Sequence, residues 1–118
     1  MNKELKIVYV EDENDLREIF AETLSLFFPD VKSFENGQLA LDYCLKNNFD
    51  VLITDLNMPV MNGVELIKNI NAHKPEIKCI ITTGNTNQYN DELNEITYLK
   101  KYGKPINMKD FFELLKSL

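Results

Sequence analysis

Short apolar runs alternate five times with segments of helical periodicity along this chain of 118 residues. The expected strands cover residues 5–10, 31–34, 51–53, 77–82 and 99–103. Strands that alternate with helices pair in parallel through right-handed crossovers, which predicts an open sheet with helices on both faces. The run Val51–Ile53 is uninterrupted and apolar, as in a strand buried on both faces. We therefore expect an α/β fold, with residues 1–118 forming one domain.

Between these runs, apolar residues recur three and four positions apart, which is the spacing of amphipathic helices. The first helix is expected over Glu13–Phe28, the third ends before Pro75, and Asn107 caps the last. A short, weakly packed and mobile helix is expected within residues 85–97. The expected core residues, helix by helix, are Leu16, Ile19, Phe20, Thr23, Leu24 and Phe27; Ala40, Leu41, Cys44 and Leu45; Leu66, Ile67 and Ile70; Tyr89, Leu93 and Ile96; and Met108, Phe111, Phe112, Leu115 and Leu118.

The charge balance narrows the class of partner, because 13 basic and 19 acidic residues give a net charge of −6. Phosphate backbones need a basic face, so direct nucleic-acid binding by this domain is not expected. The sequence has neither an apolar run long enough to span a membrane nor a signal-peptide pattern, which predicts a cytoplasmic protein without membrane contact. Cys44 and Cys79 lack metal-binding or redox spacing and are expected to be buried free thiols.

Polar residues stand at the ends of four expected strands. Glu11 and Asp12 follow the first strand, Asp55 the third, Thr83 the fourth and Lys104 the fifth. The carboxyl ends of parallel strands lie along one edge of the sheet, where α/β proteins bind ligands. Three carboxylates repel one another unless a hard cation joins them, and an oxygen-rich site of this kind suits Mg²⁺. The ammonium of Lys104 and the hydroxyl of Thr83 would then contact the anionic oxygens of a phosphoryl group on Asp55.

With these strand ends in order, the chain resembles the receiver domains of bacterial two-component response regulators over essentially its full length. The motifs that carry the resemblance are Glu11-Asp12, Asp55-Leu-Asn-Met-Pro-Val-Met-Asn-Gly63, Thr83-Gly84 and Lys104-Pro105. The resemblance implies a flavodoxin-like fold with strand order 2-1-3-4-5. It also implies that Asp55 accepts a phosphoryl group from a histidine kinase or a histidine phosphotransfer protein.

The same resemblance implies a role for each residue of the metal site. Mg²⁺ would be held by Asp12, Asp55 and the backbone carbonyl of Asn57, with Glu11 contributing through water. The phosphoryl oxygens would be contacted by Thr83, by Lys104 and by the backbone of Gly84.

Two asparagines occupy positions that tune loss of the phosphoryl group in this family, Asn57 and Asn85. Both are neutral amides able to orient a water, so we expect a phosphorylated lifetime of seconds to minutes. The family further implies a cis peptide between Lys104 and Pro105.

One position departs from the family pattern. An aromatic residue usually lies three positions before the motif lysine and turns inward as the threonine moves toward the phosphoryl group, but here Lys101 stands there. Tyr102 is the neighbouring aromatic, so the switch candidates are Thr83, Lys101 and Tyr102. This departure leaves open a second function, a docking module that works without phosphorylation.

Other classes fit the sequence less well. A phosphatase of the haloacid dehalogenase type needs a second acid two residues after its nucleophile, where Asn57 stands. A flavodoxin-type carrier would have its flavin phosphate repelled by the acidic residues that follow the first strand. We expect no enzyme activity beyond self-phosphotransfer and autodephosphorylation. The downstream partner, either a separate effector or an attached output domain, is left open, as is whether the chain acts alone.

Overall fold

The computed structural model describes residues 4–85 and 87–118. The elements, in chain order, are β1 (Lys6–Val10), α1 (Asn14–Ser25), β2 (Asp30–Phe34), α2 (Gly37–Lys46), β3 (Val51–Asp55), α3 (Gly63–His73), β4 (Lys78–Thr83), α4 (Asn90–Leu93), β5 (Lys100–Gly103) and α5 (Met108–Lys116). The strands form one five-stranded sheet in the order β2-β1-β3-β4-β5, and each neighbouring pair is parallel. The predicted flavodoxin-like fold is confirmed.

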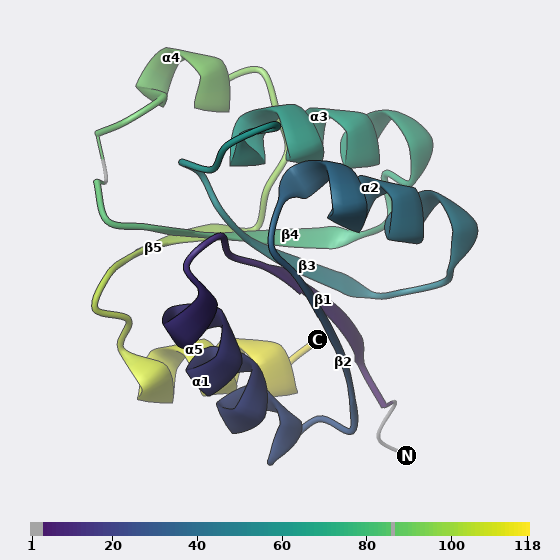
Figure 1. The fold of residues 1–118 in the computed structure, drawn as a ribbon, viewed down its shortest axis with the longest axis vertical. Helices are drawn as coiled ribbons and strands as arrows, with labels where there is room; N and C mark the ends of the chain where they lie inside the picture. The colour runs from purple at the N-terminus through teal and green to yellow at the C-terminus, as the bar shows by residue number, and fades with distance from the viewer. Residues whose placement is uncertain (1–3, 86) are drawn as a thin grey trace.

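The sheet separates two helical layers (Figure 1). One face is covered by α2, α3 and α4, and the other by α1 and α5. β3 lies in the middle of the sheet, and all five of its residues are buried. Each face therefore has its own apolar core.

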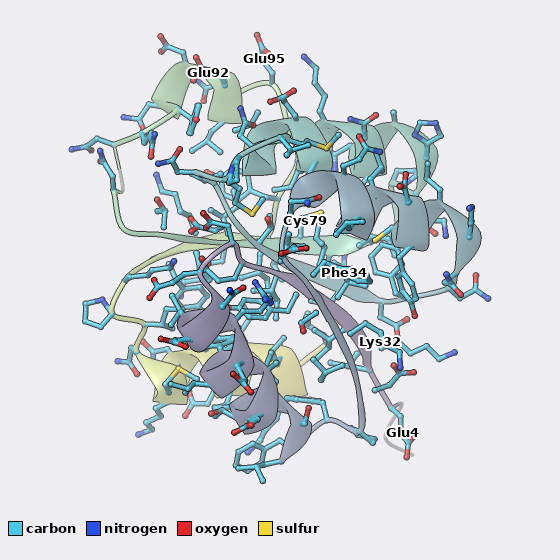
Figure 2. All side chains as sticks on the ribbon, in the orientation of Figure 1. Glu4, Lys32, Phe34, Cys79, Glu92 and Glu95 are labelled. Atoms are coloured by element: carbon cyan, nitrogen blue, oxygen red, sulfur yellow. The ribbon has the colours of Figure 1, made fainter. Side chains whose placement is uncertain are left out.

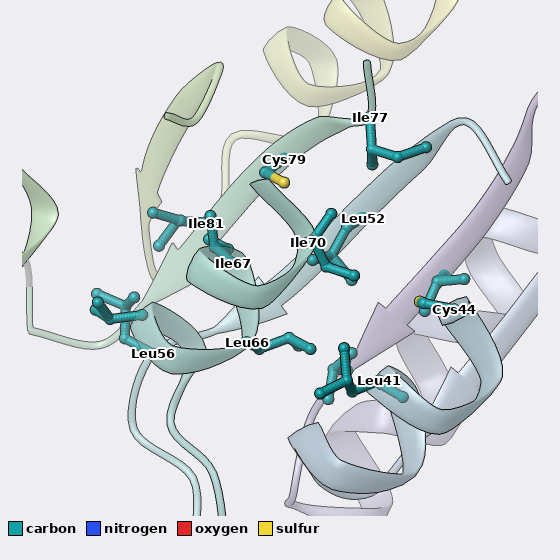
Figure 3. Packing of buried hydrophobic residues seen from close by; sticks show 14 of the residues in the cluster. Leu41, Cys44, Leu52, Leu56, Leu66, Ile67, Ile70, Ile77, Cys79 and Ile81 are labelled. Carbon is teal, nitrogen blue, oxygen red and sulfur yellow. The ribbon is translucent and has the colours of Figure 1, made fainter. Parts of the chain in front are cut away.

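The core under α2 and α3 is built from aliphatic residues and includes both thiols. Figure 3 shows Leu52 of β3 and Cys79 and Ile81 of β4 beneath Ile67 and Ile70 of α3. The prediction of free, buried cysteines is confirmed, because neither Cys44 nor Cys79 forms a disulfide. No helix among the described residues is long and apolar enough to cross a membrane.

Asparagine side chains fix the first turns of three helices. The Asn36 side-chain oxygen Oδ1 accepts the Leu39 amide at 2.9 Å at the start of α2. Asn62 and Glu65 form a reciprocal capping box at the start of α3. The expected cap at Asn107 is present and starts α5. These caps set the entry points of helices that directly follow the loops at the carboxyl edge of the sheet.

Three residues expected in the core are instead exposed: Ile19, Phe27 and Leu45. The buried stripe of α1 is narrower than its apolar pattern, because Phe20 and Leu24, four positions apart, make the main contacts with the sheet. Ile19 lies on the flank of this stripe, and Phe27 lies beyond the end of the helix at Ser25. In α2, Cys44 takes the inward position and Leu45 beside it points outward.

The fourth helix is a single turn of four residues, far shorter than the segment in which it was expected. Leu93 is its one buried residue, and Tyr89 and Ile96 beside it are only partly buried against the core. Glu92 and Glu95 project outward at this end of the molecule (Figure 2). The expected weak packing is therefore present.

Candidate functional site

Four neighbouring strands, β1, β3, β4 and β5, end at one edge of the sheet. The connections that leave the neighbouring strands β1 and β3 pass over opposite faces, since α1 covers one face and α3 the other (Figure 1). The edge beside β1 and β3 is therefore the topological switch point at which doubly wound sheets bind ligands. Glu11 follows β1, Asp55 ends β3, Thr83 ends β4 and Lys104 follows β5.

Lys104 joins two of these strand ends through its ammonium group. Its Nζ donates to Glu11 Oε1 at 2.8 Å and to Asp55 Oδ2 at 3.1 Å. The two carboxylates are almost fully buried, with side-chain exposures of 2% for Glu11 and 11% for Asp55, while Lys104 is 25% exposed. The backbone of Lys104 is fixed to β4, because its amide donates to the Thr83 carbonyl at 2.8 Å. Residues distant in the sequence thus meet at one point.

Asp12 completes a cluster of three carboxylates with Glu11 and Asp55. One oxygen from each residue lies within 4.8 Å of the other two. Asp12 is exposed, so the cluster opens to solvent on one side. An all-oxygen, acidic donor set with a solvent-facing side fits Mg²⁺, which keeps several waters when bound.

The Asp55 carboxylate is fixed by the turn that follows it. Its Oδ1 accepts the Leu56 amide at 2.7 Å, and the Leu56 carbonyl in turn accepts the Gly63 amide at 2.8 Å. A Cβ atom at residue 63 would overlap the Asp55 carbonyl oxygen, so only glycine lets α3 start so close to the end of β3.

Arg17 of α1 stabilises the loop after β1, which carries Glu11 and Asp12. Its Nη1 donates to the Glu11 carbonyl at 2.8 Å, and its Nη2 donates to Asn14 Oδ1 at 2.6 Å. Sequence analysis did not single out Arg17, and it named Gly63 only as the end of the motif that begins at Asp55. The glycine closing the motif was visible in the sequence, but its steric role depends on a close approach between backbones that only the structure shows.

Burial and neighbouring charges act in opposite directions on the pKa values of Glu11 and Lys104. Burial raises the pKa of Glu11 above its ordinary value, although the hydrogen bond from Lys104 acts against this shift. Burial alone would lower the pKa of Lys104, but its hydrogen bonds and charge interactions with Glu11 and Asp55 outweigh this, and the pKa is raised. Lys104 is therefore protonated at neutral pH.

Thr83 is buried, and its hydroxyl is engaged with the loop after β4. Oγ1 donates to the Asn85 carbonyl and accepts the Asn85 amide, each at 3.1 Å. Gly84 is exposed and has open space where a Cβ would stand. Asn57 and Asn85 are also exposed. The threonine therefore holds the loop here, and the roles expected for these residues toward a phosphoryl group stay predictions.

The two switch candidates on β5 lie on opposite faces of the sheet. Lys101 pairs in register with Ile81, and Tyr102 pairs with Thr82. Tyr102 packs edge-on against Phe111 of α5, with ring centroids 5.3 Å apart. Ile81 belongs to the opposite core, and side chains alternate along a strand, so Lys101 faces the α4 side. Tyr102 therefore points away from the face on which its neighbour Lys101 stands. The predicted cis peptide between Lys104 and Pro105 is present.

The fold and the site together define a doubly wound α/β domain whose switch point carries an acidic cluster that fits a divalent cation. The family model of the response regulator receiver domain matches residues 7–116, and the chain belongs to this family.

Individual relatives agree with this family. Chemotaxis protein CheY-3 of Vibrio cholerae is 40% identical over 73 residues, covering 61% of this chain and 56% of that protein, so the match spans about half of the relative. The N-terminal domain of WS1339 from Wolinella succinogenes superposes with a TM-score of 0.89 at 30% identity, covering 96% of this chain and 92% of that one. TrrA of Thermotoga maritima, solved in complex with Mg²⁺ and BeF, has a TM-score of 0.84 at 28% identity, covering 99% and 98%.

Proposed function

We propose that the protein is a signalling switch in which Asp55 accepts a phosphoryl group from a phosphohistidine of a kinase or phosphotransfer partner. The observation that carries this proposal is the Lys104 ammonium bridging Asp55 and Glu11, with Asp12 completing the acidic cluster. In this arrangement the Lys104 ammonium and a cation bound by the cluster can offset the negative charges of the Asp55 carboxylate and of an incoming phosphoryl group. Membership of the receiver family supports it.

In the proposed step, an Asp55 carboxylate oxygen attacks phosphorus while the phosphorus–nitrogen bond breaks. The bonding pair stays on the imidazole of the partner, and an acyl phosphate forms on Asp55. Phosphoryl transfer of this kind is catalysed mainly by alignment and charge neutralisation. The Leu56 amide holds the carboxylate in place by its 2.7 Å hydrogen bond to Oδ1.

The cation site and Lys104 would neutralise the negative charge of the phosphoryl group. Asp12, Asp55 and the backbone carbonyl of Asn57 would hold Mg²⁺, with Glu11 acting through water. The bound ion would offset negative charge on the phosphoryl oxygens. Lys104 stays protonated because of its acidic partners. Since its Nζ already donates to Asp55 Oδ2, it would lie close enough to contact a phosphoryl group on Asp55.

The output of the switch is proposed to pass through Thr83. To donate to a phosphoryl oxygen, its hydroxyl must release the carbonyl of Asn85. That loss would loosen the loop leading to α4, the helix with a single buried residue. The face formed by α4, β5 and α5 would then change its affinity for a downstream partner, as a population shift between two arrangements. The protein would act in the cytoplasm, with only self-phosphotransfer and autodephosphorylation as its own chemistry.

The test uses phosphoramidate, a small donor with a phosphorus–nitrogen bond, and intact-mass spectrometry of the wild-type chain with and without Mg²⁺. We expect a gain of one phosphoryl group that requires Mg²⁺ and is lost in Asp55→Asn. Asp50→Asn is the matched control, because Asp50 lies at the opposite end of β3 and accepts the Lys6 amide there. The control should be phosphorylated like wild type.

Failure of phosphorylation in a folded wild-type chain would overturn this proposal. It would favour the alternative of a docking module that works without phosphorylation, for which the lysine at position 101 is the motivating observation.

A further inference from the structure

A cavity of about 480 Å³ lies beside the acidic cluster, on the face of the sheet covered by α1 and α5. Its walls come from α1, from the sheet and from the segment after β5, and the lining residues are Leu16 and Phe20; Tyr9 and Thr82; and Lys104, Pro105, Ile106 and Met108. Its size falls in the range of roughly 300–1,000 Å³ that is usual for small-molecule sites. Most of the lining side chains are apolar, so the cavity offers hydrophobic contact on several sides.

Thr82 supplies an unused polar group in this wall. The residue is 1% exposed, and its Oγ1 has no hydrogen-bond partner among the described residues. Its register partners are Asp55 on β3 and Tyr102 on β5, so its side chain shares their face of the sheet. A buried hydroxyl without a partner is costly, and a molecule that satisfies it gains affinity over one that does not.

The charges at the rim select against anions. Among the described residues that line the wall, Lys104 is the one basic residue, and its ammonium already donates to Glu11 and Asp55. Asp12 adds a third carboxylate to the group. Without a bound cation, an anionic ligand would meet this excess of negative charge, whereas a neutral molecule would not.

We propose that this cavity binds a small, neutral, largely apolar molecule that carries one hydroxyl or amide group. Its apolar body packs against Leu16 and Phe20, and its polar group pairs with the Thr82 hydroxyl. The cavity shares Lys104 with the site of proposed phosphoryl transfer, but Thr82 and the α1 side chains that line it take no part in that chemistry. Binding can therefore be tested on the unphosphorylated protein.

The experiment is a protein-observed NMR titration of the full chain, without added Mg²⁺, with three probes: phenol, benzene and benzoate. We expect phenol to bind about tenfold more tightly than benzene, the factor that corresponds to one net hydrogen bond. Benzoate should not bind. In Thr82→Val, which keeps the shape and removes the hydroxyl, phenol should lose its advantage while benzene binds as before.

A blocking variant locates the site. Leu16→Trp adds bulk to the wall of the cavity and should abolish the binding of phenol and benzene. Leu39→Trp is the matched control, because Leu39 is a partly exposed leucine on α2, across the sheet. Undiminished binding of phenol to Thr82→Val or Leu16→Trp would overturn the proposal. So would the absence of shifts with all three probes in a folded protein.

Discussion

At the scale of the residue, Lys104 compensates two buried carboxylates with one ammonium group. Lys104→Met should lower the free energy of unfolding at neutral pH by about 1–3 kcal/mol, because Glu11 and Asp55 lose a charged donor. This loss of free energy of unfolding in Lys104→Met should become smaller at acidic pH. Burial raises the pKa of Glu11, so the folded state takes up its proton first, and protonation removes the unpaired charge.

Urea unfolding of wild type and Lys104→Met at several pH values measures this effect. Lys78→Met, an exposed lysine at the start of β4, is the control and should change stability little. A Lys104→Met penalty that grows as the pH falls would contradict the assignment of the charge to Glu11.

Val60 is a β-branched residue in the left-handed region, with φ of 72°. This conformation costs an L-residue with a branched Cβ roughly 1–2 kcal/mol, whereas asparagine tolerates it. Val60 is 77% exposed, so replacing it loses little packing. Val60→Asn should therefore raise the free energy of unfolding by about 1 kcal/mol in a urea titration. Val60→Ala keeps a Cβ and should gain less; an equal gain would point to exposed apolar surface as the cause.

Lys104 and Val60 differ in how well the sequence predicts their structural role. The position of Lys104 in the site was predicted, whereas the backbone conformation of Val60 was not. The strand-end residues were found because an apolar run marks where a strand ends, and parallel strands end together. The φ angle of Val60 and the reach of Arg17 to the Glu11 carbonyl depend on the path of loops, which apolar periodicity does not encode. For the same reason, the pairing of Thr83 with Asn85 could not be predicted.

At the scale of the element, α4 and α3 offer a direct comparison on one face of the sheet (Figure 1). α4 has four residues with one buried, whereas α3 has 11 residues with five buried and a capping box. Amides of α4 should exchange with solvent at least about tenfold faster than those in the middle of α3. Hydrogen exchange followed by NMR measures this difference. Equal protection of the two helices would contradict the view of α4 as the loosely held element.

Element boundaries were predicted less well than element order. The helix expected over Glu13–Phe28 ends at Ser25, because the chain must turn to enter β2 at Asp30. Exposed Ile19 and Phe27 match the helical spacing but not the width of the face that the sheet can cover. The asparagine cap of α5 was predictable, since its signal is local.

At the scale of the whole molecule, the two buried thiols make stability fall at alkaline pH. Burial raises the pKa values of Cys44 and Cys79 from 9.0 to about 12. Between these values the unfolded chain ionises its thiols while the folded chain does not. Each thiol should therefore cost about 1.4 kcal/mol at pH 10 relative to pH 8.

Urea unfolding at both pH values tests this, with the Cys44→Ala/Cys79→Ala double variant as control. The variant should be less stable overall because it leaves small cavities, but its loss between the two pH values should be smaller. Equal losses in the two proteins would contradict the burial of both thiols in the folded state.

Asp55 itself is proposed to receive the phosphoryl group. The most direct measurement is to phosphorylate the wild-type chain with phosphoramidate and Mg²⁺, reduce it with borohydride, and identify the modified residue by peptide mass spectrometry. Borohydride converts an aspartyl phosphate to homoserine, so we predict homoserine at position 55 and aspartate at position 12. Modification of Asp12 or Glu11 with Asp55 intact would contradict the account, and so would a phosphorylated chain with no reducible carboxyl phosphate.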